Sequence, residues 1–127
     1  MNEILKNKIN KYRNLKESIT KKYNNKIEKI EKIINIIEKK SEINDDDNLE
    51  TIVFKKYLEL ENVREVANYI NEKGYRIKTS SYIGERKYIG TDITKIIMSD
   101  IEIDNDLKEV VKLIQKLNYE NTLEKWG

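Results

Sequence analysis

The sequence predicts a mainly α-helical protein, with a long coiled-coil-like helix over residues 1–41 and a small helix-turn-helix-type unit over residues 48–127. Three observations support this class. An apolar side chain recurs every three or four residues through the first forty positions, with no Gly or Pro among them, as on one face of a helix. Two acidic runs, 41–48 and 99–106, flank a further helical stretch. The chain is 38% hydrophobic and 38% charged, which suits solvated helices better than a thick core.

Composition excludes several classes of function. The chain has no Cys and no His, so it lacks a thiolate nucleophile, a zinc-finger framework and the commonest general base. It also lacks a glycine-rich phosphate-binding motif, and we therefore expect no enzyme activity, no metal site and no cofactor. No apolar run approaches the roughly 20 residues of a membrane span, and the first residues lack the apolar core of a signal peptide. We expect a cytoplasmic protein with no membrane partner.

Charge is arranged in blocks. Residues 1–40 carry twelve Lys or Arg and five Asp or Glu, and residues 63–98 carry seven and four. The blocks 41–62 and 99–127 are acidic, with two against seven and four against seven. The basic blocks suit a polyanionic partner, from which the acidic blocks would be repelled.

Residues 2–40 predict one helix roughly 60 Å long. The mean spacing of its apolar residues is about 3.56, between a straight helix and a coiled-coil heptad. A helix with such a stripe is not stable alone in water. We expect a homodimeric coiled coil or a helical hairpin, the alternatives being a helix that binds another protein, nucleic acid or a membrane surface. The ten expected dimerisation residues are Leu5, Ile9, Tyr12, Leu15, Ile19, Tyr23, Ile27, Ile30, Ile34 and Ile37.

The acidic run 41–48 reads as a solvated linker and not as a metal site, because adjacent carboxylates rarely converge on one ion. In it Asp47, with Glu50 three residues later, is predicted to cap a helix from Leu49 to about Leu60. Asn62 with Glu65 predicts the cap of the next helix, which Gly74 ends. The expected inward residues of these two helices are Leu49, Ile52, Val53, Tyr57, Leu60, Val63, Val66, Ala67 and Ile70.

Residues 75–89 alternate apolar and polar positions around Gly84. This pattern predicts either a short hairpin, 75–80 against 87–89, or a long loop. Thr91 then predicts the N-cap of a short helix, with Asp92 favourable in its first turn. A final amphipathic helix is expected from Leu107 to about Tyr119, followed by a tail that Leu123 and Trp126 would hold. Expected inward residues are Ile93, Ile96, Ile97, Leu107, Val110, Val111, Ile114 and Leu117.

The motifs VREVANYINEKGYRIKT and GERKYIGTDITKIIMSD, within residues 62–98, resemble the helix-turn-helix DNA-binding segment associated with large serine recombinases. In that segment a helix ends at a glycine, a basic loop follows, and a helix opened by Thr comes next. The resemblance covers about 37 residues, and nothing here resembles the catalytic domain with its serine nucleophile, so it implies a stand-alone reader of double-stranded DNA. The matching residues are Val66, Ala67, Ile70, Asn71, Gly74, Tyr75, Thr91, Ile93, Ile96 and Ile97.

In that interpretation the helix opened by Thr91 enters a groove of the duplex. Thr94, Lys95 and Thr91 are the candidate base-reading residues, Lys95 toward guanine and Thr94 toward a thymine methyl or another base edge. Basic residues around them would hold phosphates and add salt-dependent affinity. These candidate phosphate-binding residues are Arg64, Arg76, Lys78, Arg86 and Lys87.

The function expected from the sequence is a dimeric, sequence-specific DNA-binding protein, a transcriptional regulator or accessory factor of a phage, plasmid or other mobile element. The alternative is a small helical inhibitor or adaptor that binds a protein, for example a phage anti-defence protein such as an anti-CRISPR. Its acidic runs, 45–47 with Glu50 and 100–106, would then imitate phosphates.

Overall fold

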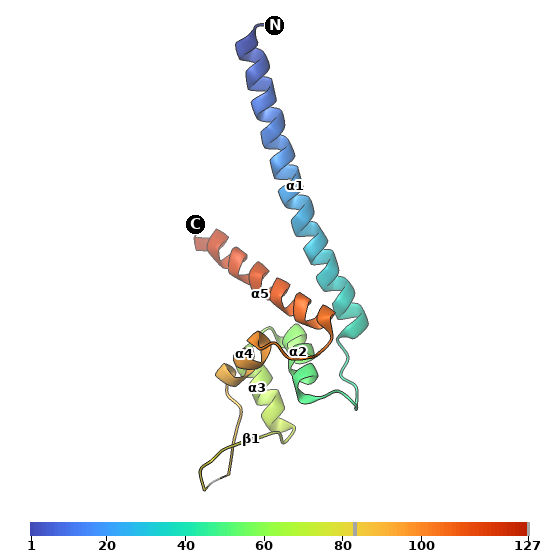
Figure 1. Ribbon diagram of the computed structural model, residues 1–127, viewed down its shortest axis with the longest axis vertical. Coiled ribbons are helices and arrows are strands. Elements are labelled where there is room, and N and C mark those ends of the chain that lie inside the picture. Colours follow the sequence, from blue (N-terminus) through green and yellow to red (C-terminus); the bar gives the residue numbers. More distant parts are fainter. Residues whose placement is uncertain (83, 127) are drawn as a thin grey trace. The chain divides into compact units, whose positions relative to one another are not determined.

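A computed structural model describes the backbone of residues 1–82 and 84–126 and the side chains of residues 1–82 and 84–120. It confirms a mainly α-helical chain with a long N-terminal helix and a short antiparallel hairpin (Figure 1). The elements are α1 (Glu3–Lys40), α2 (Leu49–Leu60), α3 (Val63–Glu72), β1 (Ile77–Lys78), β2 (Glu85–Arg86), α4 (Gly90–Met98) and α5 (Asn105–Trp126). Leu123 and Trp126, expected to hold the tail, lie outside the described side chains.

The chain forms two compact units, Met1–Ile34 and Asn35–Gly127. The first consists of α1 alone. The second begins inside the last turns of α1, where Ile36 is buried, and contains every other element. Ile36, which the predicted apolar stripe does not include, packs into this unit, while the stripe residues Ile34 and Ile37 are exposed.

Helix α2 is the centre of the second unit, since it contacts α3, α4 and α5. Because three helices surround it, burial extends beyond the face predicted from its periodicity. Phe54 and Leu58 are buried although the pattern did not select them, and the predicted Leu49 and Leu60 remain partly exposed. The other buried apolar residues of the unit include Val66, Ala67, Ile70, Ile93, Ile97, Leu107, Val110, Val111 and Ile114.

The cap of α2 differs from the prediction. Asn48, not Asp47, accepts the hydrogen bond from the backbone N–H of Thr51, at 2.9 Å. The Asp47 carboxylate instead accepts from the Asn44 N–H at 2.9 Å and from Lys55 Nζ at 2.7 Å. Asp47 therefore holds the linker in place, and Asn48 caps α2.

Lys55 is a buried cation at the point where the linker meets α2. Its ammonium group also donates to the backbone oxygen of Glu42 at 2.8 Å, and the side chains of Lys55 and Asp47 are only 8% and 12% exposed. Burial alone would raise the pKa of Asp47, but the hydrogen bonds from Lys55 and Asn44 prevail and lower it. The linker is thus fixed to the core by charge.

The second acidic run is also paired within the chain. Lys40 Nζ lies 2.7 Å from Asp104 Oδ2 and 2.9 Å from Asp106 Oδ2. The hydrogen bond from Lys40 lowers the pKa of Asp104, and the same bond raises the pKa of Lys40. These contacts join the end of α1 to the start of α5. Asp104 and Asp106 therefore stabilise the packing of these two helix ends.

Helix α3 begins and ends as its sequence predicts. Asn62 Oδ1 accepts from the Glu65 N–H at 3.1 Å. At the other end Gly74, at φ 93°, donates to the Asn71 oxygen, and the Tyr75 N–H donates to the Ile70 oxygen at 3.3 Å. This pair of bonds is a Schellman motif, which requires a left-handed residue at the position of Gly74.

Candidate nucleic-acid interface

The first turns of α3 and α4 lie against each other. A Cβ atom added to Gly90 would lie 3.2 Å from Val63 Cγ2 and 3.6 Å from the Arg64 backbone nitrogen. A methyl group at this position would be in tight contact with Val63, and glycine lets the two helix starts approach without it. The approach places Arg64, at the start of α3, beside the opening of α4.

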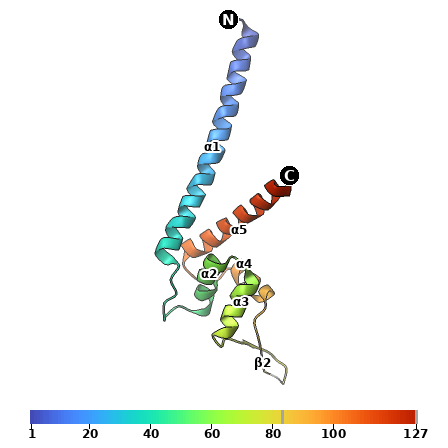
Figure 2. The same ribbon diagram turned by 180° about the vertical axis from the view of Figure 1, so that it is seen from behind.

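The hairpin follows α3 and extends beyond the helices of this unit in both views (Figures 1 and 2). Ile77 pairs with Arg86 and Lys78 with Glu85. The predicted hairpin is confirmed, but its returning strand is two residues earlier than the predicted 87–89. The reason is that the backbone beyond the strand is bonded to a side chain of α3.

That side chain is Asn71. Its amide nitrogen donates to the Tyr88 oxygen at 2.9 Å, and its amide oxygen accepts from the Tyr88 N–H at 2.8 Å. Asn71 therefore satisfies both backbone groups of Tyr88, as a neighbouring strand would. From the sequence, Asn71 is only one of the residues that carry the family resemblance, and an Asn three residues before a helix-ending Gly gives no sign of this role.

A second anchor joins the hairpin to α4. The Arg86 guanidinium donates to both oxygens of Asp92, each at 2.8 Å. Asp92 Oδ2 also accepts from the Ile89 N–H at 2.9 Å, and Asp92 is 8% exposed. The hydrogen bonds from Arg86 lower the pKa of Asp92 to about 2.

The N-terminal cap of α4 differs from the prediction, which placed Thr91 at the N-cap position. Helix α4 begins at Gly90, the residue in the N-cap position is Ile89, and Thr91 lies within the first turn. The Asp92 carboxylate, three positions after Ile89, accepts from the backbone N–H of Ile89, as the third helical residue of a capping box does. The start of α4 is therefore bonded to Asp92 and not to the Thr91 side chain. Thr91 is left exposed.

The three predicted base-reading residues differ in their surroundings. Thr91 and Lys95 are exposed and stand one helical turn apart on α4. Thr94 is partly buried, and its hydroxyl donates to the Gly90 oxygen at 3.2 Å. Lys95 lies near enough to Asp92 to contribute to the lowered pKa of that carboxyl. Thr91 and Lys95 therefore present free polar atoms, whereas the Thr94 hydroxyl is engaged.

The five predicted phosphate-binding residues fall into two groups. Arg64, Lys78 and Lys87 are exposed and form no ion pair within the described part of the chain. Arg76 donates to the backbone oxygens of Asn71 and Tyr75, at 2.9 Å and 2.7 Å, and Arg86 is held by Asp92. The first group is available to a ligand, and the second group holds the hairpin in place.

The ten residues predicted for dimerisation, the apolar stripe, are all exposed along α1. Their exposed fractions run from 37% at Ile9 and Ile37 to 63% at Tyr23. The stripe is thus a continuous uncovered apolar surface. Homodimerisation through it stays a prediction.

Other kinds of site are not indicated within the described residues. No cluster of three or more carboxylates there is arranged to hold a metal ion. None of the described helices combines the length and apolar character needed to cross a membrane. Comparisons with protein-family models, with curated proteins and with solved structures find no match to this chain.

Proposed function

We propose that the protein binds double-stranded DNA through a surface made of α4, the hairpin and the start of α3. The observation that carries the proposal is the double anchoring of the hairpin, by Arg86 on Asp92 and by Asn71 on Tyr88. Anchoring fixes a basic arm beside the opening of α4 while its lysines remain exposed. Such an arrangement of a helix and an adjacent basic arm suits a duplex, whose phosphates lie on both sides of each groove.

The roles within this surface follow from which side chains are free. Lys95 would donate to guanine O6 and N7, and the Thr91 methyl or hydroxyl would contact a neighbouring base edge. Arg64, Lys78 and Lys87 would bind phosphates. Residues 63–98 carry seven basic and four acidic side chains, so the attraction is moderate and salt-dependent.

The biological role that fits this surface is a sequence-specific regulator or accessory factor of a mobile element, as the sequence suggests. A dimer formed through the later residues of the apolar stripe, from Ile27 to Ile37, would place two such surfaces on related half-sites. The mass of the full chain in solution, measured by light scattering, tests the dimer separately from the DNA contact.

The test uses fluorescence anisotropy with duplexes recovered from a random-sequence library by repeated binding to the full chain. We expect Lys95→Ala to weaken binding to the recovered sequence by about 1–3 kcal/mol and to relax its specificity. Lys87→Ala should weaken binding to all duplexes alike and reduce the slope of log K against log salt by roughly 0.9. The matched control is Lys112→Ala, which removes the same charge from an exposed position on α5.

Two results would overturn the proposal. One is a library that yields no enriched sequence together with no salt-dependent binding. The other is a loss of affinity that is as large for Lys112→Ala as for Lys95→Ala and Lys87→Ala, because the surface would then contribute nothing beyond net charge.

A second candidate function is protein binding, and the exposed apolar stripe on α1 favours it. The acidic runs support it less than the sequence suggested. Asp47, Asp104 and Asp106 are paired with Lys55 or Lys40 inside the chain, so they are poorly available to imitate phosphates.

A further inference from the structure

The apolar stripe begins with six residues that lie entirely in the first unit, and we call them the N-terminal strip. Each is between 37% and 63% exposed. Helix α1 is the only element of residues 1–34, so this unit has nothing of its own to cover them. The residues of the N-terminal strip are Leu5, Ile9, Tyr12, Leu15, Ile19 and Tyr23.

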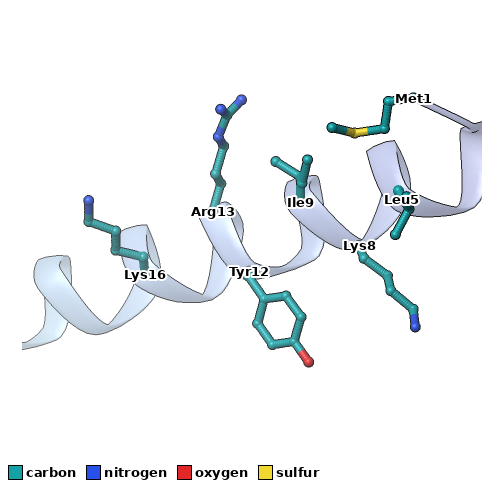
Figure 3. A pocket seen from close by; sticks show the side chains of 7 residues that line it. All are labelled: Met1, Leu5, Lys8, Ile9, Tyr12, Arg13 and Lys16. Carbon is teal, nitrogen blue, oxygen red and sulfur yellow. The ribbon is translucent and has the colours of Figure 1, made fainter.

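Basic side chains border the N-terminal strip on both edges. At 3.6 residues per turn, Lys6 and Arg13 lie along one edge and Lys8 and Lys22 along the other, all of them exposed. In Figure 3 the Arg13 side chain extends from one side of the helix and the Lys8 side chain from the other, beside Ile9 and Tyr12. The N-terminal strip is therefore an apolar surface with a row of basic side chains along each edge, and we call these two rows the cationic rims.

Carboxylates are absent from these rims. Within residues 1–23 the only acidic residues are Glu3 and Glu17, and the helical period places both on the side of α1 away from the strip. Lys16, in addition, lies within the strip itself. Every charge that a partner would meet here is positive.

This arrangement opposes pairing with a second copy of the chain. In a heptad frame with Ile9 at position a, Lys6 and Arg13 occupy e positions and Lys8 and Lys22 occupy g positions. The e and g residues of paired helices face each other and set the choice of partner. Whether the two helices run parallel or antiparallel, a homodimer would place cation against cation. This repulsion selects against self-association.

The N-terminal strip is too narrow to be a membrane-binding face. The strip presents about one apolar residue per turn, as a coiled-coil seam does, whereas interfacial helices carry a broad apolar face with Trp or Phe. The single Phe and single Trp of the chain are Phe54 and Trp126, neither of them on α1. The surface matches another helix better than a bilayer.

We propose that the N-terminal strip binds an amphipathic helix of a different protein, whose apolar seam is bordered by Asp and Glu. The apolar seams would bury each other, and the carboxylates would face the cationic rims of α1. The inference is independent of the proposed DNA contact, since no residue of the strip belongs to α3, α4 or the hairpin.

The test uses the full chain and two synthetic helical peptides of about four heptads. Both peptides have the same Leu and Ile seam, but one has Glu and the other Lys at its e and g positions. Fluorescence anisotropy should show the Glu peptide binding at least about tenfold more tightly at low salt. The difference should shrink between about 0.05 M and about 0.5 M NaCl, because exposed ion pairs are screened.

Variants then locate the binding. Ile9→Asp with Ile19→Asp should abolish binding of both peptides. Lys8→Glu with Arg13→Glu should remove most of the preference for the Glu peptide, because the two new carboxylates balance the charges of Lys6 and Lys22. The matched control is Lys21→Glu, the same change of charge at an exposed position on the opposite side of α1, which should leave the preference for the Glu peptide intact. Circular dichroism confirms that each variant keeps its helix content.

Three outcomes would overturn the inference. Equal affinity for the two peptides would show that the rims select nothing. A stable dimer that Ile19→Asp converts to monomer would assign the strip to a second copy of the chain. Tighter binding to phosphatidylserine vesicles than to the Glu peptide would assign it to a membrane surface.

Discussion

Arg86 and Asp92 are joined by two hydrogen bonds of 2.8 Å each, one from each terminal nitrogen of the guanidinium. The pair links the returning strand of the hairpin to the first turn of α4. Asp92 would repel a phosphate if it were unpaired, and Arg86 balances its charge. The residue chosen from the sequence as a phosphate ligand therefore acts, in the structure, to position the elements that carry the free lysines.

The pair makes stability depend on pH in the acid range. Because the pKa of Asp92 is lowered from 3.8 to about 2, its contribution is fully present above the ordinary pKa and is lost as pH falls through about 2. In Arg86→Ala the carboxyl keeps its burial and its bond from the Ile89 N–H but loses its main partner, so we expect its pKa to rise from about 2 toward 3.8. NMR titration of the Asp92 side-chain carbon measures the shift, with Lys87→Ala as control. An Asp92 pKa that stays near 2 in Arg86→Ala would contradict the assignment.

Removing one member of the buried pair of Lys55 and Asp47 should destabilise the protein strongly. Lys55→Met leaves the Asp47 carboxylate and the Glu42 oxygen without their donor, and we expect the free energy of unfolding to fall by on the order of 3 kcal/mol. Adding Asp47→Leu removes the stranded charge, so the double variant should recover much of the loss. Urea unfolding measures both. The exposed Lys112→Met is the control, and an equal loss in that variant would refute the role of the pair.

The boundaries of α2 and α3 were accessible from sequence because their signals are local, whereas α5 extends beyond the expected end near Tyr119, to Trp126. The cap at Asn62 and the stop at Gly74 depend on residues within a turn of the helix end, and the periodicity of α1 needs no tertiary information. The ends of α2 and α3 accordingly lie within a residue or two of the predicted positions.

The errors occur where distant partners decide between adjacent candidates. Asp47 and Asn48 are both good caps, and the choice was made by Lys55, which draws Asp47 into the linker. At α4 the helix begins one residue before Thr91, and its first turn is bonded to Asp92, whose position depends on Arg86. Periodicity gives the face of a helix but not its neighbours, so it could not indicate that α2 is surrounded or that Ile36 is the buried residue of α1.

Asn71 should determine whether the hairpin stays beside α4. Asn71→Ala leaves the Tyr88 N–H and oxygen without partners in a partly buried place, and we expect a loss of about 1–3 kcal/mol. Hydrogen exchange at the Tyr88 amide should accelerate more than exchange in α2, because the hairpin is released locally. The matched control is Asn68→Ala, an exposed Asn on the same helix. Unchanged exchange at Tyr88 would show that the anchor is dispensable.

Gly90 should tolerate one added carbon but not three. In Gly90→Ala the new Cβ meets Val63 Cγ2 at 3.2 Å, a contact that a small shift of Val63 relieves, while the helix gains up to about 1 kcal/mol from the replacement of glycine. We therefore expect Gly90→Ala to be nearly neutral. Gly90→Val forces the starts of α3 and α4 apart and should cost about 1–3 kcal/mol. Thermal unfolding measures both variants, and Val63→Ala in the Gly90→Val background should recover part of the loss. A Gly90→Val protein as stable as the parent would show that the helix starts do not pack as described.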